Sequence, residues 1–158
     1  MKIRLINMGS VRDRSLKGLI DEYAAKIGHY WPFSITDLQD VKLPRGVRDP
    51  QQQKVLEGER FLSKIEPGDF VILFDERGRQ YTSREFAAFI QRKAVELPRN
   101  LIFIVGGPYG FSQAMYDRAD MLLSLSKMTF PHELVRLFVV EQLYRAGTIS
   151  RDEPYHHD

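Results

Sequence analysis

Two uninterrupted apolar runs in the second half of the chain, residues 70–74 and 101–105, constrain the fold most strongly. Short runs without polar alternation are typical of strands that are covered on both faces, as the central strands of a parallel sheet are. Between them, Thr82-Ser83-Arg84-Glu85 is a capping-box pattern, which predicts a helix that continues to Leu97. The order strand, helix, strand predicts a parallel βαβ unit.

The rest of the chain continues this alternation of strands and helices. Further strands are predicted at residues 3–8, 33–38 and 121–125, and further helices from Leu16, from Pro50 to Ile65, from Phe111-Ser112 and from Glu133 to Ala146. A loop that contains Pro44 and Gly46 joins the strand at 33–38 to the helix after it. These elements predict an α/β fold, one domain over residues 1–158, with a mostly parallel sheet and helices on both of its faces.

Composition limits the classes of function that remain. With 43% hydrophobic and 28% charged residues, a chain of 158 residues can bury a core, which excludes a disordered protein. The chain has no cysteine, which excludes disulfides, thiolate metal sites and thiol nucleophiles. A formal net charge of +2 is too small for binding through bulk charge, so any contact with nucleic acid must be local.

Neither an export signal nor a membrane helix is evident in the sequence. The first residues have no apolar segment with a small-residue cleavage site, and the uncharged stretch 101–116 is interrupted by Gly106, Gly107, Pro108 and Gly110. We therefore expect a cytoplasmic protein.

The predicted last helix is apolar beyond the stripe that one sheet can cover. Its apolar positions include Leu134, Leu137, Phe138 and Leu143. The second face is consistent with burial against another copy of the chain in a homodimer, or with an ordinary central helix inside one chain.

Ligands of open parallel sheets bind beyond the carboxyl ends of the strands. Three segments stand at such positions: 74–78, 106–110 and 126–132. The glycines of the second segment would let backbone groups approach a flat or anionic ligand closely, although a simple tight turn has the same composition.

Several familiar signatures are absent. The segment 106–110 lacks the dinucleotide-binding spacing, and Pro108 removes one backbone donor. The chain has no phosphate-binding P-loop, no hydrolase nucleophile elbow and no H-E-x-x-H zinc motif. Because His156 and His157 are adjacent, their side chains do not converge on one ion, and we expect no metal site.

Basic side chains gather in two places, after the first predicted strand and in the loop after the second. The predicted RNA-contacting residues are Arg12, Arg14, Lys42, Arg45 and Arg48. If both groups lie on one rim they form a local phosphate-contacting patch, with Tyr30 and Trp31 near it for stacking. Taken separately, each group could be a solvated surface.

The C-terminal part of the chain carries a specific combination of motifs. These are Leu-Ser-Lys-Met-Thr-Phe-Pro-His-Glu-Leu-Val-Arg at 125–136, Glu-Gln-Leu-Tyr-Arg-Ala at 141–146 and Pro-Tyr-His at 154–156. The chain resembles, over its whole length, the RlmH family of ribosomal large-subunit pseudouridine methyltransferases, in the SPOUT class. The resemblance implies a C-terminal trefoil knot, a homodimer, S-adenosyl-L-methionine as cofactor, and methylation of ring nitrogen 3 of a pseudouridine in 23S rRNA on the assembled 70S ribosome.

The resemblance also implies roles for particular residues. The implied cofactor pocket consists of Phe74, Gly106, Gly107, Leu125, Ser126, Lys127, Met128, Thr129 and Phe130. His132 and His156 are candidates for taking the proton from the base, Arg136 for holding phosphate or developing charge, and Tyr155 for orienting the base. His132 could instead cap the last helix, and Arg136 could pair with Glu133 or Glu141. The tail departs from the family in ending with His157 and Asp158 rather than a basic residue.

Two other functions stay open on the sequence. A SPOUT methyltransferase that acts on tRNA would share the style of the cofactor motifs. A ribosome-associated binding protein that has lost catalysis would share the fold.

Overall fold

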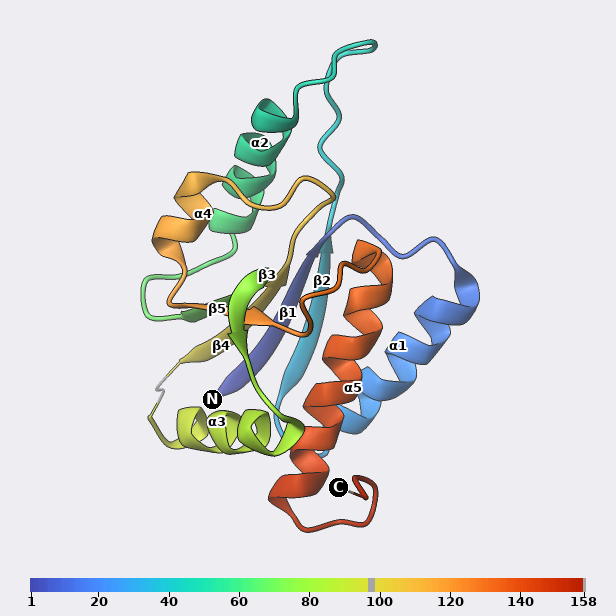
Figure 1. Cartoon of the computed structure of the whole chain (residues 1–158), viewed down its shortest axis with the longest axis vertical. Helices are drawn as coiled ribbons and strands as arrows, with labels where there is room; N and C mark the ends of the chain where they lie inside the picture. The colour runs from blue at the N-terminus through green and yellow to red at the C-terminus, as the bar shows by residue number, and fades with distance from the viewer. Residues whose placement is uncertain (97–98, 158) are drawn as a thin grey trace.

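Five strands and five helices alternate along the chain in the computed structural model, which describes residues 1–96 and 99–157 (Figure 1). In chain order they are β1 (Lys2–Met8), α1 (Arg14–Ile27), β2 (Phe33–Leu38), α2 (Pro50–Leu62), β3 (Phe70–Gln80), α3 (Ser83–Glu96), β4 (Asn100–Val105), α4 (Gln113–Arg118), β5 (Met121–Ser124) and α5 (His132–Ser150). Leu97, the predicted end of α3, lies outside the described residues. The predicted order of elements is confirmed.

The strands form one sheet in the order β2-β1-β4-β3-β5, and each neighbouring pair is parallel. The two apolar runs occupy inner positions, because β4 lies between β1 and β3, and β3 lies between β4 and β5. Residues 71–73 of the first run and all of the second are buried, as their composition predicts: Ile72 and Phe103, for example, have no exposed surface.

Helices cover both faces of the sheet, which confirms the predicted α/β architecture (Figure 1). On one face a large apolar core joins the sheet to α1, α3 and α5, with Ile20, Phe86 and Val140 among its residues. On the other face a smaller core joins the sheet to α2 and α4 through Phe61 and Met115. Among the described residues, no helix is both long and apolar enough to cross a membrane.

Two elements run further than the sequence predicts. Helix α5 ends at Ser150 rather than Ala146, because Gly147 continues the helix where it packs directly against the ring of Tyr30. Strand β3 ends at Gln80 rather than Phe74, because the chain after Phe74 returns to pair with β5.

The end of β3 pairs with β5 twice. Phe74 and Arg79 both pair with Leu123, so the chain leaves β5 after Phe74 and comes back to it within five residues. Gly78 lies on this excursion, and a Cβ atom there would stand 2.6 Å from the backbone of Leu122. A side chain would not fit, so the residue at 78 must be glycine for the segment to pack against β5.

Candidate functional site

A cavity of about 680 Å³ opens at the carboxyl ends of β3, β4 and β5. Its volume is within the roughly 300–1,000 Å³ that small-molecule sites occupy. The three segments that follow these strands form its walls, as expected for an open parallel sheet. The predicted cofactor residues that line it are Phe74, Gly106, Gly107, Leu125, Ser126, Met128, Thr129 and Phe130. Lys127 is exposed and does not line the cavity.

The glycine segment after β4 is a tight turn that brings backbone to the cavity surface. The amide of Gly110 donates to the carbonyl of Gly107 at 3.2 Å. A Cβ atom at Gly107 would lie 2.6 Å from a carboxylate oxygen of Glu57, which is buried beneath it on α2. The absence of this Cβ lets the turn pack directly over Glu57, so that its outer surface lines the cavity.

The segment after β5 forms the facing wall. Ser124 Oγ donates to the carbonyl of Ser126 at 2.8 Å, and the amide of Met128 donates to Ser126 Oγ at 3.0 Å. These bonds fix the turn while leaving apolar side chains at the surface, with Met128 73% exposed and Leu125 36% exposed. Apolar walls of this kind suit the adenine ring of the cofactor.

A charged cluster at the cavity was not predicted from the sequence. Asp75 accepts hydrogen bonds from the backbone amide of Arg77 at 2.8 Å, from its Nε at 3.2 Å, and from the hydroxyl of Tyr116 on α4. All three residues line the cavity. Asp75 and Arg77 follow the strand end that the sequence marked, but nothing in the sequence indicates that Tyr116 reaches them.

The cluster shifts the pKa values of its members. Burial alone would raise the pKa of Asp75, but the hydrogen bonds from Arg77 and Tyr116 outweigh burial and lower it. Burial, followed by the hydrogen bond to Asp75, raises the pKa of Tyr116. Asp75 is therefore a stable anion beside the cavity, and Tyr116 keeps its proton.

Glu57 is a second acidic group that the sequence did not indicate. Its side chain is 3% exposed, and Gln53 Nε2 donates to Glu57 Oε2 at 3.4 Å. The other carboxylate oxygen, Oε1, has no hydrogen-bond partner. Burial raises the pKa of Glu57 above its ordinary value.

Of the predicted catalytic residues, only His132 lines the cavity. It is the first residue of α5, and the helix has no side-chain cap, so the alternative that His132 caps this helix is wrong. The position places an imidazole between the turn after β5 and the body of α5.

Arg136, one turn further along α5, is a structural clamp in this conformation. Its side chain is 1% exposed, and its two terminal nitrogens donate to the carbonyls of Met8 and Gly9, each at 2.7 Å. Its ion pair is with Asp37 at 3.4 Å, so pairing with Glu133 or Glu141 is not what the structure shows. Burial lowers the pKa of Arg136, opposed by Asp37. Its position gives no support to the predicted contact with phosphate or developing charge.

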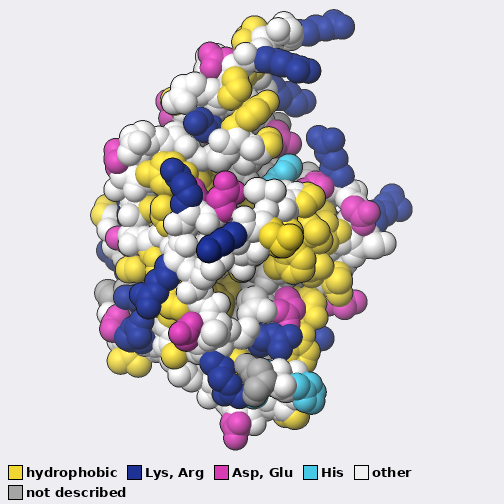
Figure 2. Space-filling view, in the orientation of Figure 1, with side chains coloured by type: hydrophobic (Ala, Val, Ile, Leu, Met, Phe, Trp, Pro, Cys, Tyr) yellow, Lys and Arg dark blue, Asp and Glu magenta, His cyan; other side chains and the backbone are white. Residues whose placement is uncertain are grey.

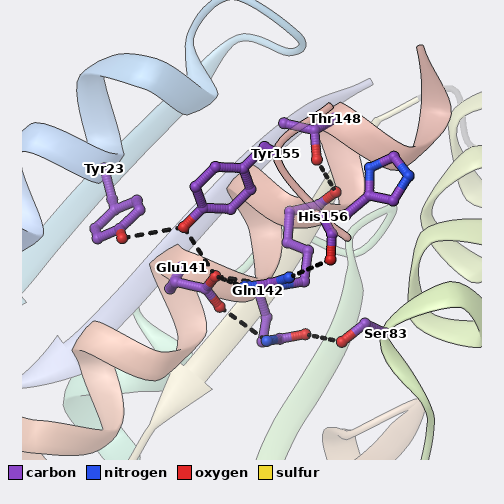
Figure 3. A network of polar contacts seen from close by, with 8 residues as sticks. Tyr23, Ser83, Glu141, Gln142, Thr148, Tyr155 and His156 are labelled. Atoms are coloured by element: carbon purple, nitrogen blue, oxygen red, sulfur yellow. Dashed lines mark hydrogen bonds and ion pairs between the residues drawn. The ribbon is translucent and has the colours of Figure 1, made fainter. Parts of the chain in front are cut away.

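The tail residues Tyr155 and His156 lie outside the cavity and against the second half of α5 (Figure 3). The hydroxyl of Tyr155 bonds to that of Tyr23 and donates to Glu141 Oε1, both at 3.1 Å. Its ring packs on Tyr144 with 4.6 Å between centroids. The carbonyl of His156 accepts a bond from Arg145 at 3.2 Å. The roles predicted for this pair stay predictions.

The predicted RNA-contacting residues are exposed and lie at the carboxyl edge of the sheet. Lys42, Arg45 and Arg48 are on the loop between β2 and α2, which projects from the molecule and carries Lys and Arg side chains at its tip (Figures 1 and 2). The backbone amide of Arg12 donates to Glu133 at 3.1 Å, beside the start of α5.

The expected stacking partners of this patch are elsewhere, so that prediction is wrong. Tyr30 and Trp31 precede β2, whereas the basic loop follows it, and the two ends of β2 are at opposite edges of the sheet. The hydroxyl of Tyr30 donates to Glu153 instead. Within residues 1–96 and 99–157, no group of three or more His, Asp or Glu side chains is placed to hold a metal ion.

Comparisons with known proteins agree with this geometry. The family model described as "Predicted SPOUT methyltransferase" matches residues 1–156. Ribosomal RNA large subunit methyltransferase H of Parabacteroides distasonis is 44% identical over 100% of both chains, and that of Christiangramia forsetii is 46% identical over 99% of both.

A solved structure with low sequence identity has the same fold. The probable methyltransferase from Bordetella pertussis Tohama I superposes with a TM-score of 0.53 at 13% identity, covering 92% of this chain and 95% of that one. The fold, the three-segment cavity and the full-length relatives together place this chain in the SPOUT methyltransferase family, among the ribosomal RNA large subunit methyltransferases H.

Proposed function

We propose that this protein transfers the methyl group of S-adenosylmethionine to ring nitrogen 3 of a pseudouridine in 23S rRNA, on the assembled 70S ribosome. The observation that carries the proposal is full-length identity of 44–46% to ribosomal RNA large subunit methyltransferases H, in a chain whose predicted cofactor segments enclose one cavity. On this proposal the protein works in the cytoplasm, as one domain.

Membership of the SPOUT family implies a trefoil knot in the C-terminal segment and S-adenosylmethionine as cofactor. The double pairing of Leu123, with Phe74 and with Arg79, returns the chain to β5 directly beside the cavity. The cavity walls therefore consist of segments that the fold locks together, which holds a bound cofactor in a fixed orientation.

Bound S-adenosylmethionine would supply a methyl group carried on a sulfonium sulfur. When the new carbon–nitrogen bond forms, the carbon–sulfur bond breaks and the sulfur becomes a neutral thioether. What remains for the protein is to exclude water, align the base, and accept the proton that ring nitrogen 3 loses. Among the predicted proton acceptors, His132 lines the cavity, so we assign it this role. Asp75, Arg77 and Tyr116 would hold the polar part of the cofactor, because they line the same cavity as a fixed polar group.

RNA binding is proposed for the projecting loop and the start of α1. Exposed cations at the carboxyl edge would contact phosphates flanking the target base, which positions the base over the cavity. We further propose a homodimer through the apolar surface of α5, where Phe138 is 39% exposed. In such a dimer one subunit would bind the cofactor while the tail and basic loops of the other contact RNA.

Transfer of labelled methyl groups tests the proposed reaction. The substrates are 70S ribosomes that lack this modification, isolated subunits, free rRNA and tRNA, with products mapped by mass spectrometry. We expect labelling of 70S ribosomes at one pseudouridine and loss of most activity in His132→Ala with cofactor binding retained. Labelling of tRNA alone would show that the substrate is tRNA and not 23S rRNA. Cofactor binding without any methyl transfer would favour a non-catalytic ribosome-binding protein.

A further inference from the structure

A second cavity, of about 320 Å³, adjoins the cofactor cavity. The two share part of their lining, including Phe74, Leu125 and Phe130. The second cavity extends from this shared wall to the start of α3 and the middle of α5, which the cofactor cavity does not reach. A group bound here would lie next to whatever the larger cavity holds.

The walls of the second cavity suit a flat ring. Five aromatic side chains line it: Phe74, Tyr81, Phe86, Phe130 and Phe138. Phe130 and Phe138 meet edge to face with 5.4 Å between centroids, so these two rings support each other. Planar ligands, nucleobases among them, stack on surfaces of this kind.

Two polar side chains interrupt this aromatic lining. Gln142 of α5 and Ser83 of α3 both line the cavity, and the serine hydroxyl donates to Gln142 Oε1 at 2.7 Å. On its other side, Gln142 Nε2 donates to Glu141 Oε2 at 2.8 Å. Figure 3 shows the three side chains in a row between the two helices. Because a carboxylate only accepts, the amide nitrogen must face Glu141 and the amide oxygen must face Ser83.

This fixed amide has one hydrogen and one oxygen lone pair left over, since a primary amide offers two of each. Glu141 is itself held by Arg145 at 2.6 Å and by the hydroxyl of Tyr155 at 3.1 Å, so the amide is anchored through the tail. A donor and an acceptor in one rigid plane match a ligand edge that presents an N–H beside a carbonyl.

We propose that the second cavity receives the target base and that Gln142 recognises it as pseudouridine; this inference rests on the proposed function. In pseudouridine the ribose is attached through carbon, so ring nitrogen 1 carries a hydrogen beside carbonyl oxygen 2. In uridine the ribose occupies that nitrogen. The amide oxygen of Gln142 accepts from nitrogen 1 and its N–H donates to oxygen 2, which leaves nitrogen 3 free to meet the methyl group. Gln142 is thus a specificity-determining residue.

Gln142→Leu is the first test, with Gln91→Leu as the matched control, because Gln91 is exposed on α3. Both are assayed on 70S ribosomes with pseudouridine at the target position and on ribosomes with uridine there, and S-adenosylhomocysteine binding and the melting temperature are measured alongside. We expect kcat/KM of Gln142→Leu to fall about tenfold or more on pseudouridine. Activity on uridine and the affinity for S-adenosylhomocysteine should each change less than about twofold, because the substitution removes no contact with either ligand.

Three results would overturn the inference. These are equal losses on both ribosomes, no loss on either, and a matching loss of S-adenosylhomocysteine binding, which would make the second cavity part of the cofactor site.

A second measurement does not depend on activity or on the folding of the variant. Pseudouridine 3′-monophosphate is added to the wild-type protein saturated with S-adenosylhomocysteine, and the side-chain amide resonances of Gln142 are followed by NMR. Larger shifts than uridine 3′-monophosphate produces support the inference, and identical shifts reject it. If the wild-type protein methylates neither ribosome, the proposed function fails while this comparison still decides what the cavity binds.

Discussion

At the scale of single residues, the most consequential side chain outside the predicted set is Glu57. It lies buried under the glycine turn, and one of its oxygens has no partner. Its pKa is raised in the folded state, so the neutral form is favoured by folding and ionisation opposes it. The contribution of protonated Glu57 to the stability of the fold is fully present below the pKa of an unfolded glutamate, about 4.3. It is lost as pH rises through the pKa of Glu57 in the folded protein.

Glu57→Gln should therefore stabilise the protein increasingly as pH rises. Glutamine has the shape of the neutral acid and does not ionise, so it removes the cost that the wild type meets at neutral and alkaline pH. Melting temperatures measured at several pH values between 4 and 8 check this. Glu59→Gln, an exposed neighbour on α2, serves as control and should show no such trend. A gain that is independent of pH would contradict the assignment of the effect to ionisation of Glu57.

Gly107 is the residue at which a single added carbon should affect the cofactor site most directly. In Gly107→Ala the new methyl would stand 2.6 Å from a buried carboxylate oxygen, so the turn must move. We expect S-adenosylhomocysteine to bind about tenfold or more weakly, since a displaced turn loses its contacts with the ligand.

The control is Gly18→Ala in α1, where a Cβ meets nothing within 4 Å. It should leave binding unchanged and stabilise the helix by about 0.5–1 kcal/mol. Calorimetric titration of both variants distinguishes a local effect on the turn from a general effect of replacing glycine. Equal affinities for the two variants would show that the turn does not contact the ligand.

At the scale of secondary structure, α5 has more roles than any other element. One side of it packs between α1 and α3, and Val139, Val140 and Leu143 there are buried. Hydrophobic side chains nevertheless remain at the surface over its first turns and the segment before it (Figure 2). The sequence suggested either a dimer or a central helix, and in the single chain α5 buries one side and leaves the other partly open.

Phe138→Asp should convert a dimer to monomer. A charge introduced into an apolar contact loses its hydration on association, which costs more than a typical dimer contact contributes. Light scattering coupled to size-exclusion chromatography measures the mass directly. Val95→Asp on α3 is the control, because that side chain is 89% exposed and should leave the mass unchanged. If the Phe138→Asp sample kept the mass of a wild-type dimer, this surface would be excluded as the interface.

The elements themselves were largely predictable from the sequence, whereas contacts between elements were not. Uninterrupted apolar runs identified β3 and β4 because burial on both faces leaves no room for polar residues. The hydrogen bond from Tyr116 to Asp75 and the burial of Glu57 under Gly107 depend on how helices pack, which no local pattern encodes. The clamp of Arg136 on Met8 and Gly9 joins residues more than 120 positions apart for the same reason.

At the scale of the whole molecule, charge is distributed unevenly although the net charge is only +2. The predicted RNA-contacting cations stand at the carboxyl edge, the edge at which the cofactor cavity opens. A substrate phosphate backbone held there would bring its bases toward the cavity. Such local contacts, rather than overall charge, would account for binding to the ribosome.

The double variant Arg45→Ala, Arg48→Ala should weaken binding to 70S ribosomes and reduce its dependence on salt. The slope of log affinity against log salt concentration is negative, and each lost phosphate contact reduces its magnitude by about one. Filter binding at several salt concentrations measures both quantities. The control pair, Lys2→Ala with Lys64→Ala, removes the same charge from exposed positions near the opposite edge. Equal slopes for the two double variants would show that the projecting loop does not contact RNA.

The double pairing of Leu123 also has a consequence for when the cofactor cavity can form during synthesis of the chain. The end of β3 emerges from the ribosome long before β5 exists, so it must stay open, or reopen, until residues 121–124 are made and placed. The cofactor cavity needs both partners of this pairing, together with the turn that follows β5. A nascent chain that has reached only β4 therefore cannot retain S-adenosylmethionine, and cofactor binding marks the completion of folding rather than an early step in it.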